Sequence, residues 1–153
     1  MKILDFTNDD FNSLYDFMQP LWFDTYSAII PKRQIEFLLD KYFSKSAIEN
    51  FRKQGYEYKK IDNFGVVIFV ERDNDIFLDK LYISPSHRGK GIPEKIFEYL
   101  LNRGKDITLN VNQGNERAVK CYLKNGFTIE VVHDVLLGDG MVNKDYVMRK
   151  RAK

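Results

Sequence analysis

The sequence predicts a mixed α+β fold in which a mostly antiparallel sheet of about seven strands is flanked by helices. Apolar residues repeat at helical spacing in the first third of the chain, and strand-like runs follow. One strand–loop–helix–strand unit predicts a parallel pair through a right-handed crossover. With 153 residues, 44% of them hydrophobic, the chain can build the core of a single domain spanning residues 1–153.

Composition excludes several classes of protein. Lys and Arg nearly balance Asp and Glu, for a net charge of +2, so no broad surface for nucleic acid is expected. Cys121 is the only cysteine, which excludes an internal disulfide and a cysteine-based metal cluster, and we expect no metal site. No apolar run approaches the ~20 residues of a membrane span, and no signal peptide is evident. These features favour a cytoplasmic protein with no membrane partner.

Helices are expected in the first third of the chain, at residues 7–20, 32–43 and 46–55. Pro20 is expected to end the first helix. Residues 21–31 are crowded with large side chains, and their periodicity is ambiguous. Ser46 and Glu49 form the capping-box pattern that predicts the start of the third helix.

Strands are expected at residues 1–6, 56–61, 65–71, 76–84, 107–111, 127–137 and 142–149. Short links between the second, third and fourth runs predict an antiparallel meander. A helix from Ile92 would carry the chain across the sheet, so that strand 107–111 lies parallel to strand 76–84. A further helix is expected at residues 116–125, before the last two strands.

A basic glycine loop joins the strand at residues 76–84 to the next helix. It reads His87-Arg88-Gly89-Lys90-Gly91, and Pro93 suits the first helical turn. Glycine accepts positive φ, and a helix start presents unpaired N–H groups, so such a loop fits an anion such as phosphate. Taken alone, the loop is also explained as a tight turn with solvated charges.

The helix at residues 116–125 carries a second pattern. Asn115, Ala118 and Tyr122 follow one another at i, i+3 and i+7 and therefore share one face. The small Ala118 would let a ligand lie against that face. The alternative is structural, with Asn115 as the helix cap, Ala118 as a helix former and Tyr122 as a core aromatic.

Together the two segments resemble the GCN5-related N-acetyltransferase (GNAT) superfamily. The similar residues are Ile83-Ser84-Pro85-Ser86-His87-Arg88-Gly89-Lys90-Gly91-Ile92, Asn115-Glu116-Arg117-Ala118 and Tyr122-Leu123-Lys124-Asn125-Gly126-Phe127. The sequence departs from the family at Ser86, where Gln or Arg is usual, and at Pro93, where Gly is common.

A looser similarity points to a branch of the family that includes bacterial polyamine acetyltransferases of the PaiA type. It rests on Trp22…Thr25-Tyr26…Ile30-Pro31, Asp79-Lys80-Leu81-Tyr82 and Asp145-Tyr146-Val147-Met148. Because related proteins keep fold and cofactor better than acceptor, this similarity says little about the substrate.

The resemblance implies that two parallel strands splay apart and hold acetyl-coenzyme A between them. The cofactor-binding residues it implies are Leu81, Tyr82 and Ile83 for the pantetheine and thioester, His87, Arg88, Gly89, Lys90, Gly91 and Ile92 for the pyrophosphate, and Asn115, Ala118 and Tyr122 along the cofactor arm, with Lys124 as a candidate contact to a cofactor phosphate. A solvated helix-end lysine is an equal alternative for Lys124.

The implied reaction is direct attack of a primary amine on the thioester, with a small molecule such as a polyamine as acceptor. Tyr122 is the expected general acid, because a phenol of pKa ~10 can protonate the leaving thiolate. Asp79 is the candidate base, unless strand alternation points it away from the site. A backbone N–H near Leu81 or Tyr82 would stabilise the oxyanion.

The acceptor pocket is expected among the aromatic residues Trp22, Tyr26 and Tyr146. Asp24, Glu36 and Asp145 are carboxylates that could hold a cationic amine, although core or surface packing explains such residues equally well. Two other functions stay open: acetylation of protein N-termini or lysines, and a coenzyme A sensor without turnover. The sequence leaves both a monomer and a homodimer open.

Overall fold

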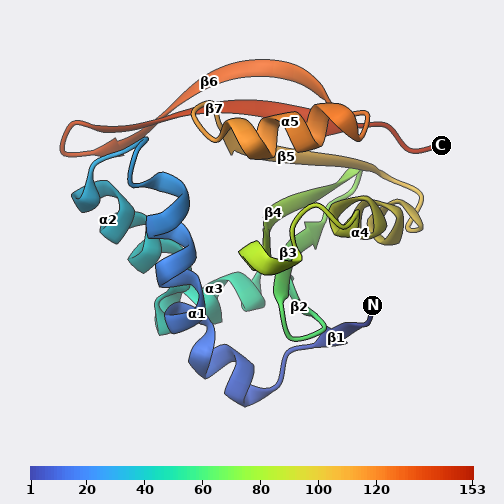
Figure 1. Ribbon diagram of the computed structural model, residues 1–153, viewed down its shortest axis with the longest axis horizontal. Coiled ribbons are helices and arrows are strands. Elements are labelled where there is room, and N and C mark those ends of the chain that lie inside the picture. Colours follow the sequence, from blue (N-terminus) through green and yellow to red (C-terminus); the bar gives the residue numbers. More distant parts are fainter.

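The computed structural model describes residues 1–153 and contains one sheet with helices on both faces (Figure 1). The strands are β1 (Ile3–Asp5), β2 (Glu57–Ile61), β3 (Gly65–Glu71), β4 (Asp75–Ile83), β5 (Asp106–Asn112), β6 (Thr128–Gly138) and β7 (Met141–Lys150). The helices are α1 (Asn8–Tyr26), α2 (Lys32–Phe43), α3 (Lys45–Lys53), α4 (Ile92–Leu101) and α5 (Glu116–Lys124). A short 3₁₀ turn, Pro85–His87, follows β4.

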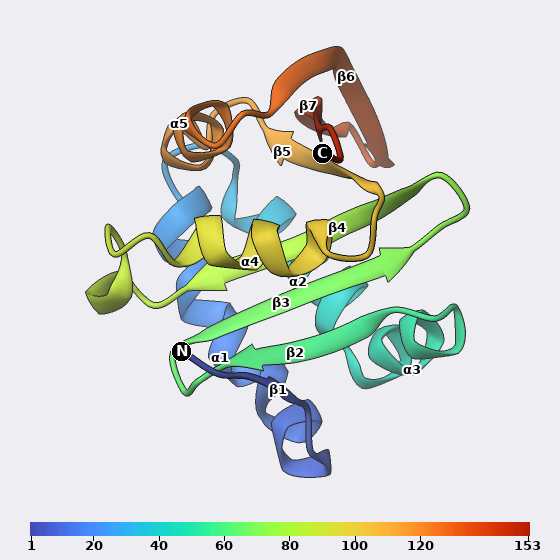
Figure 2. The same ribbon diagram turned by 90° about the vertical axis from the view of Figure 1, so that its right-hand side faces the viewer.

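The sheet has the order β1-β2-β3-β4-β5-β7-β6, and every neighbouring pair is antiparallel except β4 and β5. This arrangement confirms the predicted fold class and the parallel pair. Helix α4 makes the crossover between the two parallel strands and lies across one face of β3 and β4 (Figure 2). No helix is both long and apolar enough to cross a membrane.

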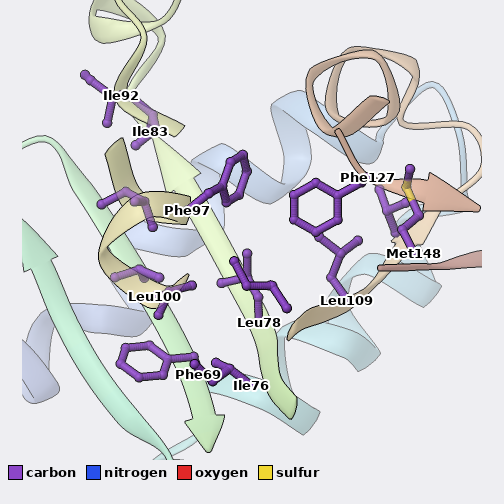
Figure 3. Close-up of a cluster of buried hydrophobic side chains, with 14 of the residues drawn as sticks. Phe69, Ile76, Leu78, Ile83, Ile92, Phe97, Leu100, Leu109, Phe127 and Met148 are labelled. Atoms are coloured by element: carbon purple, nitrogen blue, oxygen red, sulfur yellow. The ribbon is translucent and has the colours of Figure 1, made fainter. Parts of the chain in front are cut away.

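Two hydrophobic clusters cover the two faces of the sheet. Because side chains alternate along a strand, β3 sends Val67 and Phe69 to the cluster under α4 and Val66 and Ile68 to the cluster under α1 and α2. Figure 3 shows part of the first cluster, where Phe97 of α4 packs against Phe127 with ring centroids 5.0 Å apart. The two helical layers are thereby fixed to one sheet.

Helix α1 continues past Pro20, so the predicted helix end there is wrong. Pro20 is exposed, and the helix buries Leu14, Met18, Leu21 and Trp22 on one face. A proline inside a helix costs about 3 kcal/mol. Burying two large side chains beyond it contributes about 1.5–3 kcal/mol each, which is enough to keep the helix going.

Helix α3 also begins earlier than predicted. Its N-cap is Ser44, whose hydroxyl accepts a hydrogen bond from the Ala47 N–H at 3.3 Å, and Ser46 lies inside the helix. Ser44 ends α2 as well, so a single extended residue separates the two helices. Two serines in the same turn offered two caps, and the sequence pattern selected the wrong one.

A bulge in β4 determines where the sheet opens. The β3–β4 register passes from Ile68 opposite Lys80 to Phe69 opposite Leu78, which leaves Asp79 as the extra residue. The parallel pairing of β4 with β5 ends at the same place, at Leu78 opposite Leu109. Beyond it, β4 stays with β3 and β5 stays with β7, and Figure 1 shows the two strands close at one end and apart at the other.

Candidate active site

A cavity of about 510 Å³ lies where β4 and β5 separate. Its walls come from α1, α2, β4, the glycine loop, α5 and β7. The site residues predicted from the sequence that line it are Trp22, Tyr26, Asp79, Leu81, Tyr82, Ile83, Arg88, Gly89, Gly91, Asn115, Ala118, Tyr122 and Lys124. The fold thus gathers segments from both halves of the chain around one hollow.

Four of the predicted site residues do not line this cavity. His87 stacks on Phe64, with ring centroids 4.1 Å apart, because the 3₁₀ turn directs it there. Lys90 is exposed on the loop, and the side chain of Ile92 is buried in the core. Tyr146 packs against the core under α4 and α5, on the opposite face of β7 from Asp145, because neighbouring strand residues alternate.

One end of the cavity is basic and rich in backbone donors. Gly89 and Gly91 have φ of +76° and +73°, and a Cβ at either position would meet nothing within 4 Å. Gly91 is the N-cap of α4 and supplies no side-chain cap, so the first N–H groups of the helix remain available. These donors and the positive helix end suit an anion.

Basic side chains surround this helix start. Arg88, Arg117, Lys120 and Lys124 all line the cavity. Burial and the nearby Arg117 lower the pKa of Arg88 and Asp24 partly opposes this, and no carboxylate forms an ion pair with the guanidinium. A bound phosphate would supply a compensating anion, so the residues present fit the phosphates of coenzyme A.

The middle of the cavity combines a free strand edge with a buried phenol. Residues 79–83 of β4 have no partner on the β5 side. Asn115 caps α5, and its side chain accepts a hydrogen bond from the Ala118 N–H at 3.4 Å, so the structural alternative for Asn115 holds even though it also lines the cavity. Burial raises the pKa of Tyr122 well above its usual value, which keeps its hydroxyl protonated.

Aromatic rings form the other end of the cavity. The Trp22 ring lies 5.0 Å from that of Tyr26 and 6.1 Å from those of Tyr42 and Tyr82. Burial raises the pKa of Tyr42 to about 12 and also raises that of Tyr26, so both phenols stay neutral near pH 7. Tyr42 was not among the site residues predicted from the sequence, and its place on the apolar face of the second helix was the available signal.

The bulge brings two neighbouring charges into this end of the cavity. Asp79 and Lys80 both line it, and Lys80 Nζ lies 3.0 Å from Asp79 Oδ1. The same ammonium lies 3.9 Å from the centre of the Tyr42 ring. Asp79 is therefore directed to the site, as the prediction of a base requires, but it is held in an ion pair.

Asp145 is the carboxylate without a partner at this end of the cavity. It is 9% exposed, and its side-chain oxygens make no hydrogen bond or ion pair and are open to the cavity. Burial raises its pKa, and His133 and Lys80 partly oppose the rise. Asp24 and Glu36, the other two carboxylates considered from the sequence, are exposed and lie outside the lining.

The sequence profile of the acetyltransferase (GNAT) family matches residues 12–127, which include α4, β5 and α5 around the cavity. The chain belongs to this family. The structure holds no group of three or more His, Cys, Asp or Glu residues placed to bind a metal ion.

Relatives in curated collections align with part of the chain. An uncharacterised N-acetyltransferase of Mycobacterium tuberculosis is 37% identical over 81 residues, which are 50% of this chain and 51% of that protein. The peptidyl-lysine N-acetyltransferase YjaB of Escherichia coli is 40% identical over 52 residues, 34% of this chain and 35% of that protein. The aligned part thus spans about half, or less, of the length of these relatives.

Solved structures of GNAT proteins share the fold over almost the whole chain. The PaiA N-acetyltransferase of Thermoplasma acidophilum, determined with coenzyme A, superposes with a TM-score of 0.75 at 24% identity and covers 98% of each chain. The spermidine N-acetyltransferase of Vibrio cholerae, determined with coenzyme A and spermine, gives a TM-score of 0.66 at 17% identity, over 99% of this chain and 95% of that one. At these identities, the likeness is one of fold.

Proposed function

We propose that this GNAT-family protein is an N-acetyltransferase that moves the acetyl group of acetyl-coenzyme A to a primary amine of a small molecule by direct attack. One observation carries the proposal. A single cavity runs from a basic helix start, past a free strand edge, to an aromatic end with an unpaired carboxylate. That order matches an anionic cofactor at one end and a cationic acceptor at the other.

The cofactor end follows from local chemistry. The N–H groups at the start of α4 and the side chains of Arg88 and Lys124 would hold the phosphates. The backbone of Leu81, Tyr82 and Ile83 would pair with the pantetheine arm as a neighbouring strand does, and Ala118 leaves room on the α5 side. Acetyl-coenzyme A supplies the activated acyl group.

The acceptor end would bind and deprotonate the amine. We place the ammonium at Asp145, with the faces of Trp22 and Tyr26 beside it. Asp145 is better placed than Asp79 to accept a proton, because Asp79 is paired with Lys80 and a raised pKa makes Asp145 the stronger base. A backbone N–H at Leu81 or Tyr82 would stabilise the oxyanion.

Tyr122 would deliver the proton to the leaving sulfur. Its hydroxyl is protonated near neutral pH, as any phenol of pKa ~10 is, and burial raises its pKa further. The same low-polarity surroundings disfavour a thiolate, so proton transfer from the phenol remains feasible although its pKa is high. The proton lost by the amine and the proton given to sulfur therefore pass through different residues.

We further propose that the 153 residues act as one catalytic domain in the cytoplasm, as a monomer or homodimer. Strands from both ends of the chain, β1 and β7, belong to the same sheet, which supports a single domain. Cys121 is a free thiol, in keeping with a reducing compartment.

Release of the coenzyme A thiol from acetyl-coenzyme A tests this function. The panel contains small amines, peptides with free N-termini and lysine peptides, with mass spectrometry to identify the acetylated product. We expect release that depends on a small amine. Release with peptides alone would favour a protein acetyltransferase, and coenzyme A binding without release in any mixture would favour a sensor.

A further inference from the structure

The cavity contains an ammonium that belongs to the chain itself. Lys80 has a side chain only 10% exposed, yet its charge lies in the acceptor end of the cavity. Its Nζ lies 3.0 Å from Asp79 Oδ1, 3.2 Å from the Asp79 carbonyl oxygen and 3.9 Å from the centre of the Tyr42 ring. A carboxylate and an aromatic face are the groups with which proteins bind a ligand ammonium.

The β4 bulge produces this arrangement. In a regular strand, Asp79 and Lys80 would point to opposite faces of the sheet. Because Asp79 is the extra residue at the register shift, both side chains line the same cavity. The backbone thus brings two adjacent, oppositely charged side chains to the same cavity, where they form an ion pair.

The charges at the acceptor end add up to a single free negative charge. Among the lining residues of α1, α2, β4 and β7, the charged ones are Asp79, Lys80 and Asp145. Lys80 neutralises Asp79, so only Asp145 is left for a substrate. The other charged lining residues lie on the glycine loop, α4 and α5, and are Arg88, Glu94, Arg117, Lys120 and Lys124.

We propose that the Lys80 ammonium occupies the subsite that a second ammonium group of a substrate would need. The enzyme therefore selects amines with one positive charge over polyamines. The inference rests on the proposed function and narrows its acceptor to a monocationic amine with an apolar body. A polyamine would bring further ammonium groups towards Lys80 without a free carboxylate to receive them. The aromatic walls would accept an alkyl or aryl body in their place.

The first test uses the unmodified protein and needs no variant. Initial rates are compared for a series of n-alkylamines, the α,ω-diamines of the same chain lengths, and spermidine. We expect kcat/KM to be at least about tenfold higher for the monoamine of each pair, since one ion pair or like-charge contact in a shielded site changes affinity by that order. Equal or higher kcat/KM for diamines or spermidine overturns the inference and leaves the proposed function standing. No turnover of any amine overturns both.

The second test removes the Lys80 ammonium from the subsite. In Lys80→Met the carboxylate of Asp79 loses its partner, so the diamine-to-monoamine ratio of kcat/KM should rise about tenfold. The matched control is the double variant Asp79→Asn/Lys80→Met, which removes both charges and should show no such rise. A folded Lys80→Met protein with an unchanged ratio, or an equal rise in the double variant, contradicts the role of Lys80. Thermal unfolding checks that each variant is folded.

Discussion

At the scale of single residues, Asp145 is a binding group that lowers the stability of the folded protein. A carboxylate that is 9% exposed and unpaired is unfavourable when charged, and its raised pKa expresses that cost. Burial therefore favours the neutral form more strongly in the folded protein than in the unfolded chain. The residue therefore contributes most favourably at low pH, and that contribution is lost as the pH rises through its folded-state pKa.

Replacing Asp145 with Asn should raise stability at neutral pH by about 1 kcal/mol, a usual gain when a functional site is neutralised. The gain should shrink as the pH falls towards the ordinary carboxyl pKa, because the wild-type residue is then neutral too. Urea unfolding at several pH values measures this difference. The same variant should lower kcat/KM by about 100-fold. A variant that is less stable at neutral pH, or equally active, would contradict this account of Asp145.

Tyr122→Phe should reduce turnover by about 100-fold while coenzyme A affinity changes little. The ring would keep its packing against Phe97 and Phe127, whose centroids lie 6.0 and 5.4 Å away, and only the hydroxyl is lost. Tyr99→Phe is a matched control, because Tyr99 packs against the same hydrophobic cluster but lies outside the cavity lining. Turnover that is unchanged across the pH range in Tyr122→Phe would remove this residue from the mechanism.

At the scale of elements, the start of α4 and the β4 bulge form different ends of the cavity. The helix start offers donors because Gly91 supplies no side-chain cap and both loop glycines have positive φ. The bulge ends the β4–β5 pairing and turns Asp79 and Lys80 into the cavity. The first element suits an anion, and the second shapes the acceptor end.

Gly89→Val tests the loop, with Gly104→Val as its control. Both glycines have positive φ, +76° and +80°, and open space around a Cβ, so both variants should lose about 1–2 kcal/mol of stability through backbone strain. Only Gly89→Val should also weaken coenzyme A binding, by at least about tenfold. Calorimetric titration measures the affinity. Equal affinity in the two variants would refute a phosphate-binding role for the loop.

The order of elements was largely predictable from the sequence, and the failures have local causes. Helix α1 passes Pro20 because Leu21 and Trp22 find a hydrophobic cluster that only the folded chain supplies. The bulge at Asp79 leaves a trace in β4, where the apolar residues of the cluster under α4 step from Leu78 to Leu81 in place of the usual two-residue interval. That step alone does not show which residue is extra, because the register is a relation between β3 and β4. Near a bulge or a turn, the alternation of residues along a strand no longer predicts which way each side chain points.

At the scale of the whole molecule, the cavity results from how two groups of strands share one sheet. Strands β1–β4 form one group and β5–β7 the other, joined through only four parallel residue pairs. The cluster under α4 spans both groups of strands, from Phe69 to Met148, and packs them together. The gap is thus part of the packed fold.

The residues of the site could be predicted in so far as they carry local signals. The glycine loop and the α5 face are contiguous or evenly spaced, and most of their predicted residues line the cavity. Tyr42, Lys80 and Asp145 come from three distant elements and meet only through the sheet order. The sequence offered both Asp145 and Tyr146 for the acceptor pocket, and only the packing of β7 decides which of these neighbours faces the cavity.

A crystal structure of the protein with coenzyme A tests the central claim most directly, namely that the gap between β4 and β5 holds the cofactor. We expect density for the pantetheine arm along residues 81–83 of β4 and for the pyrophosphate at the start of α4 beside Gly89 and Gly91. Coenzyme A bound elsewhere on the protein, or a gap closed by continued pairing of β4 and β5 beyond Leu78 and Leu109, would contradict it.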